Sequence, residues 1–537
     1  MHSAFVQYIY LILIILGLVM LANKLKLAYP IVLVLGGLAL SFVGLFSNIA
    51  IDPETVFFVF LPPLLYESAW QVSWKQFWKW RRVITGFAFP IVILNACVVA
   101  FFSAWLIPGF TLALGFLLGG IISPPDAVSA TTIMRRVAVP RGLLSIVEGE
   151  SLLNDASSLI VFRFALVAVI TGQFHFQEAA ASFFFVIFGG VLIGLLVGLI
   201  FYAVHRFLPT TTSIEIVLTL VTPYCMYYAA EQFHVSGVLA VVSGGLFLSS
   251  RRDRMLSYRS RIEGVNVWTN LVFVLNGLIF LLIGLQLPSI IGQLGDGGLG
   301  NAVWYGLAIT FVLIVTRLVC ALGSSLFTTF MSRFITVADA HPGWRNPLIF
   351  GWAGMRGVVS LAMALSIPVV AGEGQAFPYR NLILFITFIV ILVTLCFQGL
   401  TLPWVVRRIK PEADKDATLS EAEQEIVIQK KLTLKSLEFL NEKYGAERAR
   451  NEHLDNLFQQ LEIKENFFNR ELKETENVRE NSLHGFQIIY LEMLERQRNL
   501  LGQMNRKNEF DEDLIRKYLS LTDVEEFKIR EKSLPDA

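Results

Sequence analysis

The stretch Glu148-Gly149-Glu150-Ser151-Leu152-Leu153-Asn154-Asp155 places three carboxylates within eight residues. It lies in a largely apolar run, residues 142–170, that is long enough to cross a bilayer, because a membrane-spanning helix needs about 20 apolar residues. An ionised side chain at bilayer depth is costly, and one that occurs there usually has a function. The sequence therefore predicts a membrane protein that needs acidic groups inside the bilayer.

Composition supports this class for the whole chain. Of its 537 residues, 55% are hydrophobic and 16% are charged, whereas soluble domains carry about 25% charged residues. The net charge of +1 gives no reason to expect nucleic-acid binding. All the cysteines fall in apolar segments without a CxxC or Cys/His cluster, so we predict neither a disulfide framework nor a metal cofactor. They are Cys97, Cys225, Cys320 and Cys396.

Apolar runs of the required length recur along the first 410 residues, so we predict an all-α polytopic fold with about thirteen transmembrane helices. The spans begin near Phe5, Ala28, Thr55, Val83, Phe110, Gly142, Ala181, Ser213, Val235, Trp268, Val303, Pro347 and Tyr379. After Pro411 the sequence becomes rich in charged and amide residues, with apolar residues at helical spacing. We therefore predict a transmembrane domain over residues 1–410 and a helical cytoplasmic domain over 411–537, which is either a solvated bundle or a regulatory module.

The loops between the spans alternate in charge. One set is rich in Lys and Arg, and includes Arg251, Arg252, Arg254, Arg259 and Arg261. The other set holds Asp52, Glu54, Glu178, Asp296 and Glu373, with Arg380 as its one clear base. Because loops with excess Lys and Arg stay in the cytoplasm, we expect the N-terminus outside, the tail in the cytoplasm and an odd number of spans.

Two spans carry helix-breaking sequences at mid-depth. They are Gly119-Gly-Ile-Ile-Ser-Pro-Pro-Asp126 in the fifth span and Gly351-Trp-Ala-Gly-Met-Arg-Gly357 in the twelfth. The two spans are seven apart and so run in opposite directions. Interrupted helices at matching positions of two halves are typical of transporters with inverted repeats, where the breaks free backbone groups to bind ions.

The sixth span carries hard oxygen ligands on adjoining faces. Ser151 and Asp155 are four residues apart and share a helix face, and Glu150 and Asn154 form a neighbouring pair at the same spacing. A hydroxyl, an amide and a carboxylate together suit small cations such as Na⁺ or Li⁺. This span therefore contains the candidate cation site.

Two arginines inside spans, Arg317 and Arg356, require partners at that depth. The simplest pairing sets Glu150 and a second carboxylate, with Asp126 as the candidate, against these two arginines. Asp155 is then the carboxylate left to titrate, and Glu67 of the third span is a further acidic group at depth. Other charges near span ends are expected to be interfacial or locally paired; they are Glu148, Arg163, Glu215 and Glu231.

A buried carboxylate favours its neutral form, and either a proton or a bound cation can neutralise it. If the protein rearranges readily only when Asp155 is neutralised, it must carry H⁺ or Na⁺ in each direction. Asn154 is not titratable, so we predict that one charge is exchanged for one charge and that transport is electroneutral.

Four motifs together resemble the monovalent cation–proton antiporters of the NhaP/NHE type, over about residues 5–408. They are Phe-Leu-Pro-Pro-Leu-Leu-Tyr-Glu at 60–67, Ser-Pro-Pro-Asp-Ala at 123–127, Glu-Ser-Leu-Leu-Asn-Asp at 150–155 and Gly-Met-Arg-Gly at 354–357. The resemblance implies thirteen spans, a homodimer, a dimerisation domain and a six-helix core with two crossed discontinuous helices. Pro125 departs from the family, which often has Thr or Val before the aspartate.

The resemblance also implies roles for individual residues. It implies Asp155 as the carboxylate that binds the cation and the proton. It implies that Asn154, Ser151, Glu67 and Asp126 support the site, with Asp155, Ser151, Glu67 and Asp126 as the Na⁺ ligands, and that Glu150 and Asp126 form ion pairs with Arg356 and Arg317.

These observations predict a secondary antiporter, not an enzyme, that exchanges Na⁺ or Li⁺, with K⁺ as a further candidate, for H⁺ in the cell membrane and serves pH regulation. One alternative is a Na⁺-coupled symporter of an organic anion, which the excess of carboxylates over arginines near the breaks disfavours. A second is an ion-gated membrane sensor that signals through the tail, which leaves the carboxylates of the sixth span unexplained.

Overall fold

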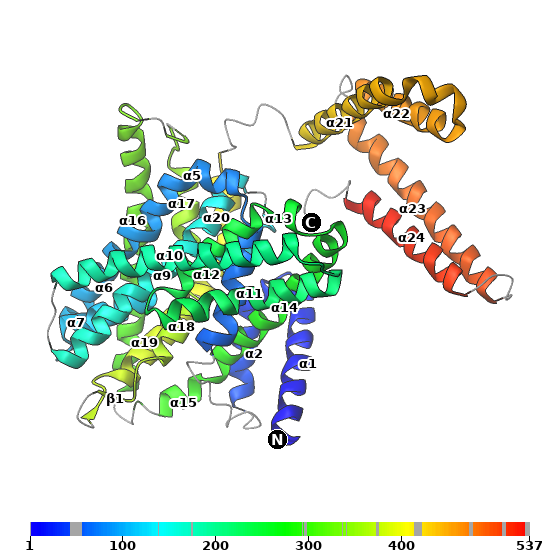
Figure 1. Ribbon diagram of the computed structural model, residues 1–537. Helices are drawn as coiled ribbons and strands as arrows, with labels where there is room; N and C mark the ends of the chain where they lie inside the picture. Colours follow the sequence, from blue (N-terminus) through cyan, green and yellow to red (C-terminus); the bar gives the residue numbers. More distant parts are fainter. Residues whose placement is uncertain are drawn as a thin grey trace. The chain divides into compact units, whose positions relative to one another are not determined.

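The computed structural model consists mainly of helices in the part of the chain that it describes (Figure 1). It describes residues 2–42, 56–137, 139–172, 176–292, 294, 298–335, 337–339, 341–371, 375–412, 421–471, 476–506 and 512–531. Within these ranges the strands are the two-residue β1 (Val370–Ala371) and β2 (Gln375–Ala376), which pair antiparallel. The helices form two compact units, Met1–Glu412 and Ala413–Ala537. The predicted all-α fold is confirmed.

Eight helical segments of the described chain are long and apolar enough to cross a membrane. They are Trp74–Leu106, Leu112–Met134, Arg141–Thr171, Ser182–Phe207, Thr212–Gln232, Tyr258–Gly292, Leu299–Met331 and Arg380–Ile409. Three shorter apolar helices are Ile9–Leu25, Tyr29–Ser41 and Gly237–Ser249. The predicted third and twelfth spans fall on shorter helices, and the start of the third, near Thr55, lies outside the described residues. The number thirteen stays a prediction.

The helices of the first unit pack as two groups. The α9 group contains α5 (Trp74–Gly86), η2 (Phe87–Ile91), α6 (Val92–Leu106), α7 (Leu112–Ile122), α8 (Ala127–Met134), α9 (Arg141–Thr171), α16 (Leu299–Met331), α17 (Arg345–Trp352), α18 (Val358–Leu365), α19 (Arg380–Val393), η3 (Thr394–Gln398) and α20 (Gly399–Ile409). The α11 group contains α1 (His2–Leu25), α2 (Tyr29–Ser41), η1 (Val56–Phe60), α4 (Leu61–Gln71), α10 (Phe176–Phe207), α11 (Thr212–Gln232), α12 (Gly237–Ser249), α13 (Arg252–Met255) and α14 (Tyr258–Leu285). A short helix, α15 (Leu287–Gly292), contacts both groups.

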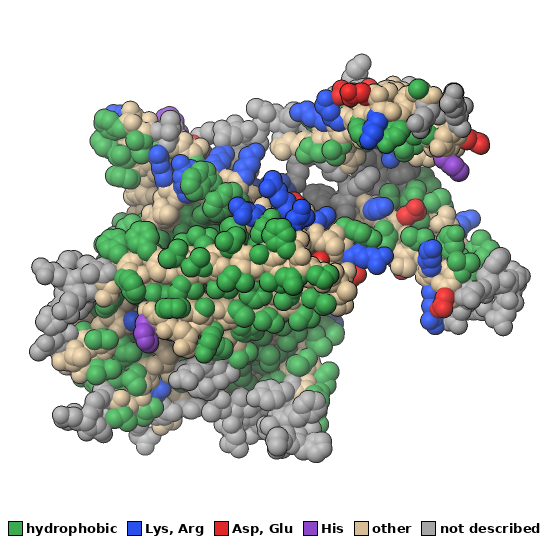
Figure 2. Space-filling view, viewed as in Figure 1, with side chains coloured by type: hydrophobic (Ala, Val, Ile, Leu, Met, Phe, Trp, Pro, Cys, Tyr) green, Lys and Arg blue, Asp and Glu red, His purple; other side chains and the backbone are tan. Residues whose placement is uncertain are grey.

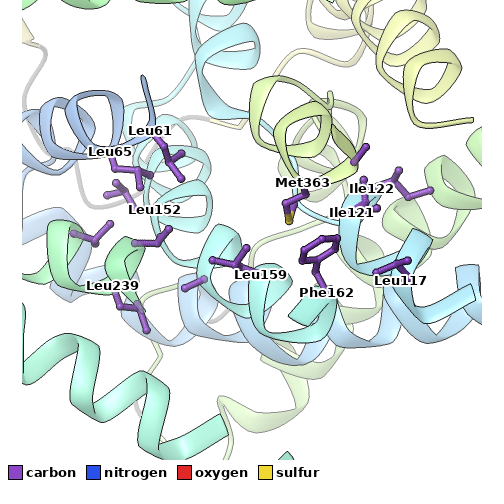
Figure 3. Close-up of a cluster of buried hydrophobic side chains, with 14 of the residues drawn as sticks. Leu61, Leu65, Leu117, Ile121, Ile122, Leu152, Leu159, Phe162, Leu239 and Met363 are labelled. Carbon is purple, nitrogen blue, oxygen red and sulfur yellow. The ribbon is translucent and has the colours of Figure 1, made fainter. Parts of the chain in front are cut away.

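Helix α9 lies at the boundary of its group, where it also contacts α4, α10 and α12 of the other group, and it runs unbroken for 31 residues. It ends at Gly172, whose backbone is left-handed with φ of +69°, as is common after the last turn of a helix. Figure 3 shows Leu152 of α9 among Leu61 and Leu65 of α4, while Phe162 lies toward α7 on the other side of the helix. The contact between the groups beside α9 is therefore largely apolar.

The two predicted helix breaks are confirmed. Residues 123–126 separate α7 from α8, and residues 353–357 separate α17 from α18. Pro124 and Pro125 lack the amide donors that a continuing helix needs. The breaks touch, because the amide of Asp126 donates to the carbonyl of Met355 at 2.7 Å. The two interrupted helices therefore meet at their non-helical segments.

Lys and Arg side chains gather at one end of the first unit, above a wide apolar belt (Figure 2). We call this the basic end and define it by Arg81 and Arg82 on α5 and Arg251, Arg252 and Arg254 at α13. The acidic loop residues Asp52, Glu54, Asp296 and Glu373, and the side chain of Glu178, lie outside what the structure describes.

The second unit is helical, as predicted for the tail. Its elements are α21 (Glu421–Tyr444), η4 (Gly445–Arg450), α22 (Glu452–Glu471), α23 (Glu476–Arg506) and α24 (Glu512–Glu531). Helix α21 packs against α22, and α23 packs against α24. Ion pairs support both hairpins; Arg448 bonds Asp455 at 2.7 Å in the first, and Arg498 bonds Asp523 at 2.7 Å in the second.

Candidate ion-binding site

Asp155 lies in the middle of α9, and its side chain is 6% exposed. Its carboxylate forms no hydrogen bond or ion pair with any residue in the described part of the chain, although Asp126 is close enough for the two charges to interact. A buried carboxylate without a donor is unusual, because an uncompensated buried charge is costly. Asp155 is therefore the acidic group of this region that is free to take up a proton or a cation.

Asn154 and Ser151 connect α9 to the first break. The Asn154 side-chain amide donates to the carbonyl of Pro125 at 3.1 Å, and the Ser151 hydroxyl accepts from the amide of Ala127 at 3.2 Å. The Oδ1 atom of Asn154 is buried and has no partner among the described residues. Both side chains thus hold the break beside Asp155, and each keeps oxygen lone pairs for a further ligand.

Asp126 is the N-cap residue of α8. Its Oδ1 accepts from the amide of Val128 at 3.1 Å, and its Oδ2 accepts from the hydroxyl of Ser129 at 2.7 Å. Capping of this kind satisfies helix amides that otherwise lack acceptors. Gly357 of the second break lies against this carboxylate, and a Cβ there would come within 2.6 Å of Oδ2. Asp126 therefore helps to fix the crossing, and it faces Asp155 as a second negative charge.

Arg356 has different partners from those predicted. Its Nε donates to the carbonyl of Ile122 at 2.9 Å, its Nη2 to that of Ser123 at 3.2 Å and its Nη1 to that of Gly354. The prediction that Asp126 pairs with one of the two arginines is wrong for the described residues, since Asp126 caps α8 instead. The reason is geometric: the ends of α7 and α17 leave carbonyl groups unbonded, and a guanidinium with five donors satisfies several of them at once.

Arg317 pairs with Glu150. Nη1 and Nη2 donate to Oε1 and Oε2, both at 2.8 Å, and the two side chains are 2% and 1% exposed. Arg317 also lies over the ring of Phe350, with its Cζ atom 5.0 Å from the centroid. Gly354 makes room for it, because a Cβ there would lie 2.2 Å from the Arg317 Nε. This bidentate pair joins α9 to α16 inside the α9 group.

Glu67 lies on α4, across the group boundary from α9. Its carboxylate accepts a hydrogen bond from the side-chain amide of Gln71, one turn along the same helix. The charges that act on it include those of Arg135 and Glu148, which are themselves paired at 3.1 Å. The structure thus places Glu67 toward the basic end of the site and not within the hydrogen bonds of the crossing.

Sequence reasoning missed one long-range pair. Arg163 of α9 pairs with Glu231 of α11 at 3.0 Å, although we expected both to be interfacial or locally paired. The available signal was opposite charges near the corresponding ends of the sixth and eighth spans. Glu215 accepts from the amide of Ser257, the N-cap residue of α14, at 3.1 Å, so it supports the start of that helix, which is a structural role.

The sequence matches the family described as "Sodium/hydrogen exchanger, transmembrane" over residues 10–408. The chain belongs to the sodium/hydrogen exchanger family. A relative from Bacillus subtilis, a "Sodium, potassium, lithium and rubidium/H(+) antiporter", is 35% identical over 379 residues, which make up 69% of this chain and 56% of that protein. The chain thus spans a little over half of the length of that relative.

Other members of the family match over most of their length. A Mycobacterium tuberculosis protein, called an uncharacterized Na(+)/H(+) exchanger, is 30% identical over 514 residues, or 95% of this chain and 93% of that protein. Among solved structures, the sodium proton antiporter MjNhaP1 from Methanocaldococcus jannaschii is similar with a TM-score of 0.59 and 18% identity, covering 76% of this chain and all of that one. The last comparison shows a shared fold.

Proposed function

We propose that this protein is a secondary antiporter that exchanges Na⁺ for H⁺ across the cell membrane. The observation that carries the proposal is the buried carboxylate of Asp155, which has no hydrogen-bond or ion-pair partner among the described residues and lies where two broken helices meet. Its neighbours Glu150 and Asp126 are each satisfied by donors, so neither competes for the role. The family membership and the printed activities of the relatives support the same function.

Cation and proton compete for Asp155 in this proposal. When H⁺ leaves, the carboxylate binds a cation together with Ser151, Asp126, Glu67 and the free Oδ1 of Asn154. Asp155 must be neutralised before it moves past the apolar contact between the groups, because a bare carboxylate there is costly. One charge moves in each direction, so exchange is electroneutral.

The cargo, orientation and assembly are part of the proposal. Li⁺ and K⁺ are further candidate cargoes, in line with the ions in the name of the Bacillus subtilis relative. The basic end faces the cytoplasm with the tail, and the N-terminus lies outside, because positively charged loops stay inside. The protein acts as a homodimer in the membrane, without enzymatic activity.

The test is proton flux into liposomes that contain purified protein, with Na⁺, Li⁺ and K⁺ supplied in turn at several pH values. We expect Na⁺-dependent proton release that neither creates a membrane potential nor responds to an imposed one. Flux that requires an organic anion, or the binding of Na⁺ and H⁺ together, contradicts the proposal. Flux that drives a potential contradicts electroneutrality alone.

A further inference from the structure

The pair of Arg163 and Glu231 crosses the boundary between the two helix groups. Nη2 of Arg163 on α9 donates to both carboxylate oxygens of Glu231 on α11, at 3.0 and 3.3 Å. We infer that this ion pair is a lock that closes the path from the site to the membrane face opposite the basic end, and that it opens once in each transport cycle. The inference rests on the proposed exchange function.

The position of the pair follows from the two helices that carry it. Gly149 of α9 lies against Phe77 and Ile84 of α5, so the first half of α9 is at the basic end. Arg163 follows Asp155 by eight residues, which is about 12 Å along a helix toward the other end. Glu231 is in the last turn of α11, whose first turn lies at the basic end beside α13 and α14. The lock therefore lies between Asp155 and the far membrane face.

Aromatic packing lies next to the lock. Tyr227, one turn before Glu231, is 5% exposed and contacts the ring of Phe58 edge-on, with centroids 5.7 Å apart. A Cβ on Gly237 of α12 would meet the Tyr227 ring at 2.7 Å. The α11 side of the boundary is thus a packed surface, and the hydrogen bonds from Arg163 attach α9 to it.

The lock differs in kind from the other ion pairs of α9. Arg317–Glu150 and Arg135–Glu148 each join α9 to a helix of its own group, so relative motion of the groups leaves them intact. Arg163 and Glu231 are 42% and 31% exposed. Because neither side chain is fully enclosed by protein, opening this pair leaves no fully buried charge without its partner, unlike the Arg317–Glu150 pair. The pair therefore holds the groups in register and still opens readily.

The first test ties the two positions together. The four cysteines are first replaced by alanine, and Arg163→Cys and Glu231→Cys are then joined by a bifunctional methanethiosulfonate. A linker is used because a direct disulfide needs a Cα separation of about 4.4–6.8 Å, whereas Arg163 and Glu231 meet through the ends of two long side chains. We expect exchange to fall at least about tenfold on linking, because only one of two states is left populated. Exchange returns when the linker is reduced.

The matched control links two positions within the α11 group. Val186→Cys and Ser236→Cys suit this purpose, since the Ser236 amide donates to the carbonyl of Val186 at 3.3 Å between α10 and α12. This linked protein is expected to exchange at its unlinked rate. If the Arg163–Glu231 link forms completely, as shown by mass, and exchange continues unchanged, the lock does not exist.

The second test needs no cysteines. Glu231→Gln weakens the lock, so we expect the half-saturating Na⁺ concentration on the far side to fall about two- to fivefold, the size expected for an exposed pair. The reversed pair, Arg163→Glu with Glu231→Arg, restores the original value. An unchanged value in Glu231→Gln overturns the inference.

These outcomes separate the inference from the function beneath it. If the unmodified protein performs no cation–proton exchange, the proposed function fails. If it exchanges normally and both tests of the pair show no effect, the lock alone is wrong.

Discussion

Two carboxylates on one helix, Glu150 and Asp155, differ in their hydrogen-bond donors, and this difference underlies the separate roles proposed for them. They are five residues apart on α9, and both are buried, with 1% and 6% exposure. Glu150 receives two hydrogen bonds of 2.8 Å from Arg317, whereas Asp155 receives none from the described residues. Both carboxylates are buried, so burial does not distinguish them. The proposed roles rest on whether a side chain donates hydrogen bonds to the carboxylate. A carboxylate that is already paired with an arginine gains little from binding a cation.

The largest effect on transport is expected at Asp155, the carboxylate that has no hydrogen-bond donor among the described residues. Asp155→Asn removes the carboxylate for which the proton and the cation compete in the proposed exchange, so proton flux in liposomes should fall to the level of protein-free vesicles. The fold should survive, because an amide needs no counter-charge at that depth. Glu148→Gln, seven residues earlier and half-buried in a pair with Arg135, is the matched control and should retain exchange. Substantial Na⁺-dependent flux in Asp155→Asn refutes the role given to Asp155.

Glu150→Gln tests whether the buried pair of Glu150 and Arg317 stabilises the fold. It leaves the Arg317 charge buried without a partner, which should lower the free energy of unfolding by about 3–5 kcal/mol. The thermal midpoint of the purified protein in detergent measures this loss. The double variant Glu150→Gln with Arg317→Met should recover part of it, because both charges are then gone. If Glu150→Gln unfolds at the same temperature as the unmodified protein, the pair is not structural.

Arg356 extends the comparison to an arginine whose hydrogen-bond acceptors among the described residues are backbone carbonyl groups and not a carboxylate. Arg356→Ala deprives three carbonyl groups at the crossing of their donor, and an unsatisfied buried group costs roughly 1–3 kcal/mol. We expect a lower thermal midpoint than for the unmodified protein. Arg356→Lys should recover little, because an ammonium cannot reproduce the planar fork that reaches several carbonyl groups. Full stability and activity in Arg356→Ala contradicts this account of the crossing.

The smallest effect is expected in the tail, where ion pairs are exposed. The hydrogen bond from Arg448 lowers the pKa of Asp455, so the pair stabilises α22 when Asp455 is ionised. This contribution is present above the ordinary pKa of an aspartate, about 3.9, and is lost as the pH falls through the lowered value. Amide hydrogen exchange in α22 should therefore differ between Asp455→Asn and the unmodified full chain at neutral pH and converge in strong acid. Proton flux should be unaffected.

Several features of the site could be predicted because their signals are local. Pro124, Pro125 and the glycines 354 and 357 favour a helix break where they cluster, since they lack an amide donor or favour other backbone conformations. The position of Asp155 within an apolar span, with Ser151 one helical turn away, predicts a cation site. Each of these signals lies within a single span, so it can be recognised without knowing which helices are its neighbours.

Partners of the charged residues could not be predicted in the same way. The pairing of Arg163 with Glu231 joins residues 68 positions apart, and that of Arg317 with Glu150 joins residues 167 positions apart. The prediction for Arg356 failed because the carbonyl groups at a helix end are invisible in a list of side chains. Such carbonyls are acceptors for an arginine as much as a carboxylate is.

The sequence by itself determined that this is a helical membrane protein, that two spans are interrupted and that acidic residues lie within apolar spans. Hydropathy, helix breakers and buried charge are properties of short segments, so they can be read without the fold. Only the tertiary structure decided which donors satisfy Glu150 and Asp126, which carbonyl groups Arg356 bonds and which ion pair crosses from one helix group to the other. Those outcomes depend on which helix ends and side chains meet in space, and packing alone brings them together.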